Sequence, residues 1–368
     1  MKILIEITEA VRSNRGWGRY AGELVEALVK LDRENQYTFF YHSVESLTSS
    51  EREWRDRLSA PNVTFFPIEI CRERYDALEE DRRASFLDDQ FPDADLYHAV
   101  TEFPFHVTRI PKITTIHEIS PLLFHDHFSD RWLSYFLRYI REALATSAKV
   151  ITVSENTRNE LIEWVGASPD LMKPISNGVS ELFFSKPVPV AKQGSALDLL
   201  YVGPVSDPLK NFEVLWKAFC SSPSGTTLHV IASDTNYDRF IKERQVSIDR
   251  AKSLRISSHV TDEQLLDFYR QASVLVFPAL HEGFGLPVLE AMAVGLPVVC
   301  NGQSGLREVA DGVNFPFGSN SPEQLWQAVC SAADAPLSQR EWGRKKASGR
   351  TWERAAEQYL EVYEHVVR

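Results

Sequence analysis

Two glutamates that bracket a glycine-rich turn are the residues of this 368-residue sequence best placed to do chemistry. Glu282 is followed by Gly283, Phe284, Gly285, Leu286 and Pro287, and an apolar helical run then carries Glu290. Backbone N–H groups at such a helix start bind anions. Carboxylates repel anions but accept hydrogen bonds from hydroxyl groups. A phosphate flanked by hydroxyl-rich groups is a sugar nucleotide, so the segment predicts that class of ligand.

A lysine in a second glycine-containing loop is a candidate partner for the phosphates. Lys210 follows an apolar strand that ends near Val202, and Gly203 and Asn211 stand in the same loop. A lysine ammonium there would act as a point charge on a diphosphate and stabilise the leaving group. The residues alone leave an exposed surface lysine equally open.

A third glycine-rich segment lies near the start of the chain. Gly16 and Gly18 match a dinucleotide-binding pattern, but the first strand ends near Ile7, too early for the glycine to form the tight turn. We therefore expect Gly16 to let the backbone approach a phosphate or sugar. For Arg19 an acceptor contact and a solvated helix position both stay open.

A histidine follows another expected strand. His117, with Glu118 beside it, comes just past the apolar run that ends at Ile116. A histidine buried for structural reasons is the ordinary interpretation. The alternative is a hydrogen bond to a sugar hydroxyl at the edge of the sheet.

The pattern of the whole chain indicates where these loops lie. Short apolar strands alternate with helical segments, which predicts an α/β fold of two doubly wound, Rossmann-like domains. Strands are expected at 2–7, 37–41, 63–68, 96–99, 113–116, 150–153, 199–202, 228–231, 254–257, 274–277 and 297–300. Helices are expected at 18–31, 130–148, 157–164, 211–219, 261–271, 287–293, 322–332 and 351–368, with Thr157 and Glu160 as a capping box. Ligands of such folds bind outside the carboxyl ends of the strands.

Composition narrows the class of protein. The share of hydrophobic residues is 43%, that of charged residues is 25% and the net charge is −11, which argues against broad nucleic-acid binding. The cysteines Cys71, Cys220, Cys300 and Cys330 are scattered, as in a reducing cytoplasm. No leader or membrane-spanning run is expected. We predict a cytoplasmic protein, with any membrane contact peripheral at the inner face.

The segment from His281 to Glu290 resembles the E-x7-E signature of the retaining glycosyltransferases of family 4. Other segments resemble that family in the same order along the chain: 153–157, 176–179, 201–203, 269–278 and 291–299. The resemblance implies the GT-B fold, with an acceptor-side domain 1–180, a nucleotide-sugar domain 181–350, and a helix 351–368 that packs back on the first domain.

The resemblance also implies roles for the residues above. Glu282 would orient the transferred sugar, Glu290 the ribose, and Lys210 the diphosphate, with the amides of 283–286 assisting. The base would lie near Ser257–Val260, with Val260 as a contact, and His117 would lie near the sugar. Many relatives have a basic residue just before the lysine, where this chain has Leu209. Phosphate neutralisation should then depend more on Lys210 and the backbone amides.

These observations favour a metal-independent hexosyltransferase without cofactor. A UDP-glucose type of donor is favoured, GDP-mannose comes next, and the acceptor is a glycan or lipid-linked glycan.

Asp93 and Asp95 form a literal D-x-D, but they precede a strand at the wrong edge of the sheet. An aromatic-basic helix at 130–148 is core or a membrane contact. The alternatives are a GT-B sugar-nucleotide epimerase and a catalytically silent nucleotide-sugar-binding subunit.

Overall fold

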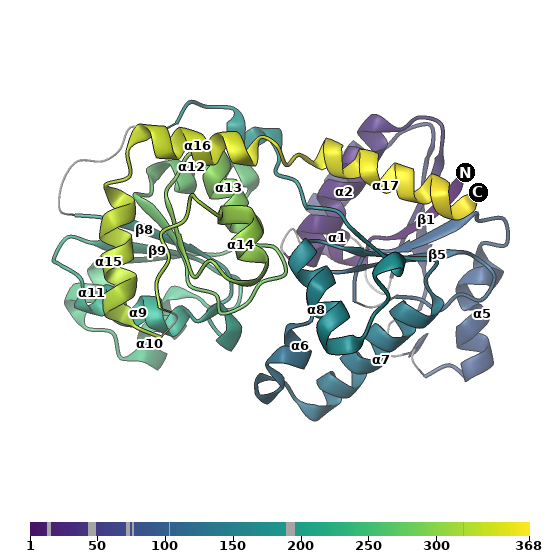
Figure 1. Cartoon of the computed structure of the whole chain (residues 1–368), viewed down its shortest axis with the longest axis horizontal. Coiled ribbons are helices and arrows are strands. Elements are labelled where there is room, and N and C mark those ends of the chain that lie inside the picture. Colours follow the sequence, from purple (N-terminus) through teal and green to yellow (C-terminus); the bar gives the residue numbers. More distant parts are fainter. Residues whose placement is uncertain are drawn as a thin grey trace. The chain divides into compact units, whose positions relative to one another are not determined.

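The chain folds into two α/β units. The computed structural model describes residues 1–12, 16–42, 49–70, 74–75, 77–102, 104–188, 196–318 and 320–368 (Figure 1). Unit 1 comprises Met1–Gly178 and Trp352–Arg368, and unit 2 comprises Val179–Thr351. The boundaries predicted from the sequence, at 180 and 350, lie within two residues of these. Cys71 and residues 189–195 lie outside the described residues.

Unit 1 is built on a parallel sheet of seven strands in the order β3-β2-β1-β4-β5-β6-β7. The strands are β1 (Lys2–Glu6), β2 (Gln36–His42), β3 (Val63–Ile68), β4 (Leu96–Ala99), β5 (Lys112–Ile116), β6 (Lys149–Thr152) and β7 (Met172–Pro174). The α-helices are α1 (Thr8–Arg12), α2 (Trp17–Leu31), α3 (Ser49–Arg57), α5 (Glu80–Gln90), α6 (Ser120–Leu123), α7 (Asp130–Thr146), α8 (Glu155–Val165) and α17 (Trp352–Val367). Strand β4 is fully buried, as expected for a strand covered on both faces.

Unit 2 repeats the architecture with a parallel sheet of five strands in the order β10-β9-β8-β11-β12. The strands are β8 (Asp198–Val202), β9 (Thr227–Ile231), β10 (Leu254–Ser257), β11 (Val274–Phe277) and β12 (Val298–Cys300). The α-helices are α9 (Phe212–Ser221), α10 (Tyr237–Arg244), α11 (Ile248–Lys252), α12 (Asp262–Gln271), α13 (Leu286–Val294), α14 (Ser304–Ala310), α15 (Pro322–Ala333) and α16 (Leu337–Ala347).

The expected strands and helices are all present, but one strand and eight α-helices of the described part of the chain were not expected; the helices are α1, α3, α5, α6, α10, α11, α14 and α16. The starts of α8 and α13 also differ from the expected ones. Strand β7 was missed because it is three residues long and ends in Pro174, which suits only the margin of a sheet. Helix α8 begins at Glu155, since the Ser154 side chain accepts a hydrogen bond from the Thr157 amide. The capping box at Thr157 therefore does not form. Helix α13 begins at Leu286, one residue before the expected Pro287.

The C-terminal helix α17 belongs to unit 1, where it packs against α2 (Figure 1). A buried hydrogen-bond network fixes it to the sheet. The Tyr359 and Tyr20 hydroxyls are 2.6 Å apart, and the Tyr20 hydroxyl is 3.1 Å from that of Thr115. His98 then joins Thr115, at 2.9 Å, to the Tyr363 hydroxyl, at 2.6 Å. Burial lowers the pKa of His98 to about 3, so this ring is neutral.

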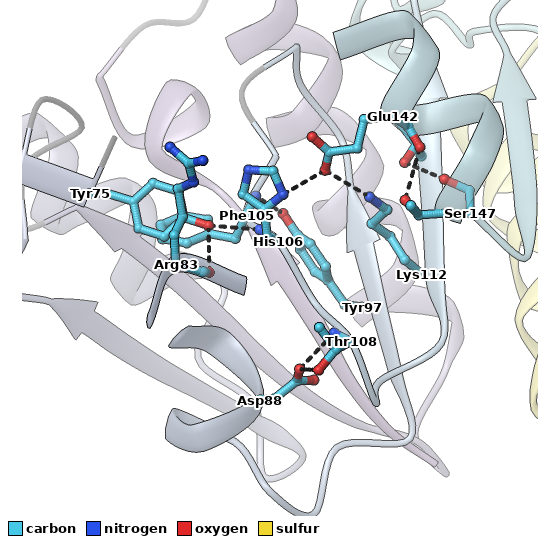
Figure 2. Close-up of polar contacts among 12 residues, drawn as sticks. Tyr75, Arg83, Asp88, Tyr97, Phe105, His106, Thr108, Lys112, Glu142 and Ser147 are labelled. Carbon is cyan, nitrogen blue, oxygen red and sulfur yellow. Dashed lines mark hydrogen bonds and ion pairs between the residues drawn. The ribbon is translucent and has the colours of Figure 1, made fainter. Parts of the chain in front are cut away.

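A partly buried ionic cluster joins β5 to α7 (Figure 2). Glu142 is 2.9 Å from His106 Nδ1 and 3.4 Å from the Lys112 ammonium, whose side chain is 2% exposed. Burial lowers the pKa of Lys112, and the nearby Glu142 partly offsets this. Burial alone would raise the pKa of Glu142, but hydrogen bonding from His106 and the charge of Lys112 lower it. Lys112 begins β5, at the edge opposite His117, so the cluster holds the fold rather than a ligand.

The aromatic-basic helix 130–148 divides its side chains between core and solvent. Phe136 and Tyr139 are buried, and Trp132 and Tyr135 pack half-buried beside them. The exposed positions of α7 include Arg131, Arg138 and Arg141. The aromatic stripe is therefore mainly core, and membrane contact through the arginines stays a prediction. No helix in the described ranges combines the length and apolar character needed to cross a membrane.

We predict that Tyr359→Phe lowers the free energy of unfolding by about 1–2 kcal/mol, because it leaves the buried Tyr20 hydroxyl with Thr115 alone. Urea unfolding of the variant and the parent measures this. Lys30→Met is the control, because its 3.1 Å pair with Glu353 is exposed and should be worth about 0.5 kcal/mol or less. Equal losses in the two variants would contradict a special role for the buried network.

Candidate active site

The loop that follows β11 opens onto a helix, as the sequence predicts. Gly285 is the N-cap of α13 with φ +103°, a conformation that favours glycine. A Cβ on Gly285 would lie 2.5 Å from Leu306 Cδ2, so the position is also sterically closed to larger residues. No side chain of the described residues caps α13. Pro287 has no N–H and the Val288 amide donates to the Gly285 carbonyl, so the Leu286 amide and those of the preceding loop are the ones suited to an external anion.

Lys210 and Glu282 meet at the carboxyl edge of the unit 2 sheet. The Lys210 ammonium donates to Glu282 Oε1 at 2.6 Å, and the two side chains are 21% and 13% exposed. Lys210 ends a 3-10 turn, Pro208–Lys210, whose N-cap Asp207 accepts from the Leu209 amide. Strands β8 and β11 are paired, so the loops that follow them are neighbours. A hydrogen bond from the Leu280 amide to the Leu209 carbonyl, at 2.7 Å, ties the loops together.

Most of the other residues predicted for unit 2 lie in these two loops. Gly203 follows β8, and its amide donates to the Ile231 carbonyl at 2.9 Å. Asn211 follows Lys210 in a left-handed conformation, φ +49°. Phe284 is buried within the loop after β11. Val260 follows β10, which lies two strands from β8 on the same edge. The structure thus gathers Gly203, Lys210, Asn211 and 282–286, with Val260 farther along.

Glu290 lies one turn inside α13 and is 3% exposed. Its Oε2 accepts a hydrogen bond from the Tyr269 hydroxyl at 2.8 Å. Tyr269 comes from α12 and is itself fully buried. Contact of Glu290 with a ribose stays a prediction, and this tyrosine was not among the predicted residues. The sequence gives little sign of this role, because Tyr269 lies on the apolar face of α12 with Leu265 and Leu266 and so resembles an ordinary core residue.

The loop before α2 carries the glycines predicted for unit 1. Gly16 is the N-cap of α2 with φ +51°, and it is exposed. Gly18 is buried in the first turn. Arg19 lies 3.7 Å from Glu23, one turn along the same helix, and its side chain is 12% exposed. An acceptor contact by Arg19 stays a prediction.

His117 is 7% exposed and lies just past the carboxyl end of β5. Its Nε2 is 2.8 Å from the Val100 carbonyl, so Nε2 carries the proton and donates. The Tyr20 ring packs edge-on against the imidazole at 4.6 Å. Burial lowers the pKa of His117 to about 4, and hydrogen bonding and Glu118 only partly counter this. A neutral imidazole with Nδ1 as acceptor suits a hydroxyl group better than acid–base chemistry.

A buried carboxyl group near His117 was missed by the sequence analysis. Glu102 follows β4, the neighbour of β5 in the sheet, and is 2% exposed. Burial, and then the negative charge of Glu118, raise its pKa well above the ordinary value. The signal was its place a few residues after a buried strand, at the same edge as His117.

Asp93 and Asp95 make local contacts at the opposite edge. Asp95 accepts from the Lys2 amide at 2.7 Å, and Asp93 lies 3.6 Å from the Lys2 ammonium. Both aspartates therefore hold the start of β1. They are not placed with the other candidate residues.

Two doubly wound units, one with a lysine–glutamate pair beside an uncapped helix start, define the GT-B class of glycosyltransferases. Sequence models agree: "Glycosyltransferase Family 4" matches residues 14–181, and "Glycosyl transferases group 1" matches residues 196–334. The chain belongs to this glycosyltransferase family.

One curated relative covers nearly the whole chain, and another covers part of it. O-antigen chain mannosyltransferase B of Escherichia coli is 27% identical over 99% of both chains. A D-inositol 3-phosphate glycosyltransferase of Kineococcus radiotolerans is 27% identical over 62% of this chain and 59% of its own length. Among solved structures, sucrose-phosphate synthase of Thermosynechococcus elongatus superposes with a TM-score of 0.79 at 19% identity, covering 100% of this chain and 99% of its own. HepE of Anabaena, in complex with UDP and glucose, superposes with 0.76 at 17% identity, covering 99% and 100%. These two structures share the fold.

We predict that Glu102→Gln stabilises the protein more as the pH rises. A raised pKa means that Glu102 contributes most stability below the pKa of the unfolded chain, about 4.3, and loses it as the pH rises toward the folded pKa. At pH 8 the variant should therefore melt about 2–4 °C above the parent, a shift that corresponds to about 1 kcal/mol. Near pH 4.5 the difference should vanish.

Thermal unfolding at the two pH values checks this. Glu69→Gln, at an exposed acid in the same unit, is the control and should show the same small difference at both pH values. A Glu102→Gln variant that is destabilised equally at both would contradict the assignment of a neutral buried carboxyl group.

Proposed function

We propose that this protein transfers a hexose, with retention, from a nucleoside-diphosphate sugar to a glycan or lipid-linked glycan during polysaccharide synthesis. The observation that carries the proposal is the 2.6 Å pair of Lys210 and Glu282 beside the start of α13. It combines a cation and uncapped amides for a diphosphate with a carboxylate for sugar hydroxyls.

In this proposal the donor binds along the carboxyl edge of the unit 2 sheet. Lys210 and the first amides of α13 hold the diphosphate and stabilise the charge that develops as it leaves. Glu282 accepts hydrogen bonds from the sugar, Glu290 from the ribose, and the base lies near Val260. No metal ion or cofactor is assigned.

Unit 1 is assigned to the acceptor. His117, neutral with Nε2 held by the Val100 carbonyl, would accept a hydrogen bond from a sugar hydroxyl through Nδ1. The acceptor hydroxyl loses its proton to an oxygen of the departing diphosphate. No enzymic nucleophile is assigned, because Glu282 is committed to hydrogen bonding.

The name of one relative helps to choose between the two candidate donor sugars. The full-length relative is named a mannosyltransferase and acts on the O-antigen chain by its name. This moves a GDP-mannose type of donor ahead of the UDP-glucose type that the sequence analysis favoured. A glycan acceptor of the O-antigen kind fits the same relative.

We predict that the protein consumes GDP-mannose or UDP-glucose at the same rate with and without a chelator.

Lys210→Met should lower transfer about 10²–10³-fold, the usual cost of losing one group that stabilises a developing negative charge. Lys217→Met is the control, because Lys217 is an exposed lysine of the adjacent α9 and should leave the rate unchanged.

A donor screen with radiolabelled sugars and a lipid-linked glycan acceptor measures transfer, and NMR of the product reports the anomeric configuration. Inverted product would overturn the retaining part of the proposal. Interconverted donor without any transfer product would indicate a sugar-nucleotide epimerase instead. Loss of activity with the chelator would contradict metal independence.

A further inference from the structure

A short segment outside the predicted site supports the loop that carries Glu282. It runs from Asn301 to Leu306 and comprises the three-residue connection after β12 and the first three residues of α14. The side-chain nitrogen of Asn301, Nδ2, donates to the Ala279 carbonyl at 2.5 Å and to the Leu280 carbonyl at 3.1 Å. Its Oδ1 accepts from the Gln303 amide at 3.0 Å, which fixes the segment itself.

The segment also holds both backbone polar groups of Glu282. The Glu282 amide donates to Ser304 Oγ at 3.0 Å, and the Glu282 carbonyl accepts from the Gly305 amide at 2.9 Å. The Ser304 hydroxyl in turn donates to the Gln303 carbonyl at 2.7 Å, so its lone pair faces the Glu282 amide. The position and direction of the Glu282 backbone are thereby set from outside its own loop.

The two segments are in close contact. A Cβ on Gly305 would lie 2.1 Å from the Gly283 carbonyl oxygen, so only glycine fits. A small shift of either segment therefore displaces the other.

Ser304 itself adopts an unusual backbone conformation. Its φ is +52°, in the left-handed region that glycine adopts without strain and serine does not. A turn alone would be better served by glycine at this position. The strained serine is explained if its hydroxyl is needed. This hydroxyl accepts a hydrogen bond from the backbone amide of Glu282.

We propose that Ser304 is a positioning residue for sugar transfer, which acts by holding the Glu282 backbone so that the carboxylate meets the hydroxyls of the donor sugar. The inference rests on the function proposed above. It predicts an effect on the step that involves the sugar and none on binding of the nucleoside diphosphate, since Lys210 and the α13 amides are unchanged.

Ser304→Gly separates this role from a structural one. Removing the side chain relieves the backbone strain that the positive φ causes, so the melting temperature should stay equal or rise. The affinity for GDP and for UDP, measured by titration calorimetry, should stay within about twofold. The kcat for transfer should fall about 10- to 100-fold, as expected when a contacting group is displaced by a fraction of an ångström to 1 Å.

Gln245→Gly is the matched control. Gln245 has φ +50° at the end of α10, where it is exposed, so the substitution relieves the same strain. It should raise the melting temperature and leave both transfer and nucleotide binding unchanged.

Three results overturn the inference. The first is transfer by Ser304→Gly at the parent rate. The second is a loss of nucleotide binding and stability in step with activity, which indicates a purely structural residue. The third is a parent protein that binds GDP or UDP but transfers no sugar, which overturns the proposed function and the inference with it. The parent rate therefore distinguishes the two failures.

Discussion

The ion pair between Lys210 and Glu282 is the interaction on which the account of unit 2 depends. It joins the loops after two paired strands, and its side chains are only 21% and 13% exposed. A partly buried pair keeps both charges in place without a ligand, because each compensates the desolvation of the other. A diphosphate would compete with Glu282 for the ammonium. In the function proposed above, the carboxylate would become available to sugar hydroxyls once Lys210 turned to the phosphates, so recognition of the sugar would follow recognition of the diphosphate.

Rigid supports surround this pair and the candidate residues of unit 1. In unit 2 the segment 301–306 holds the Glu282 backbone, and Tyr269 holds the Glu290 carboxylate. In unit 1 the ring of Tyr20 packs on His117 while its hydroxyl bonds to Tyr359 of α17. The C-terminal helix therefore lies one side chain away from a candidate site residue. Groups held by buried partners keep their geometry through a reaction, which is what electrostatic stabilisation of a leaving group requires.

The sequence predicted every described strand but β7 because each of these strands is a short apolar run. It predicted eight of the described α-helices and missed eight others, among them α5 and α16, whose residues are mostly charged or polar. It also predicted that Lys210 and Glu282 lie in loops at one edge, since parallel strands bring their carboxyl ends together. It could not predict that Lys210 pairs with Glu282, because pairing depends on side-chain direction across two loops. Ser304 was missed because a serine in the left-handed region has no sequence signature, and Glu102 because burial of a carboxyl group is set by the packing around it. Strand β7 was missed because three residues ending in proline carry no periodicity.

The affinity of Glu282→Gln for a nucleoside diphosphate measures whether Glu282 and the diphosphate compete for Lys210. The amide side chain of this variant would keep the shape of the carboxylate but, without its negative charge, would compete less with the phosphates for Lys210. Titration calorimetry with GDP and UDP, without sugar, should show binding about tenfold tighter than in the parent, about 1.4 kcal/mol, while sugar transfer falls. Binding that is unchanged or weaker than in the parent would contradict the claim that this ion pair is exchanged for a diphosphate.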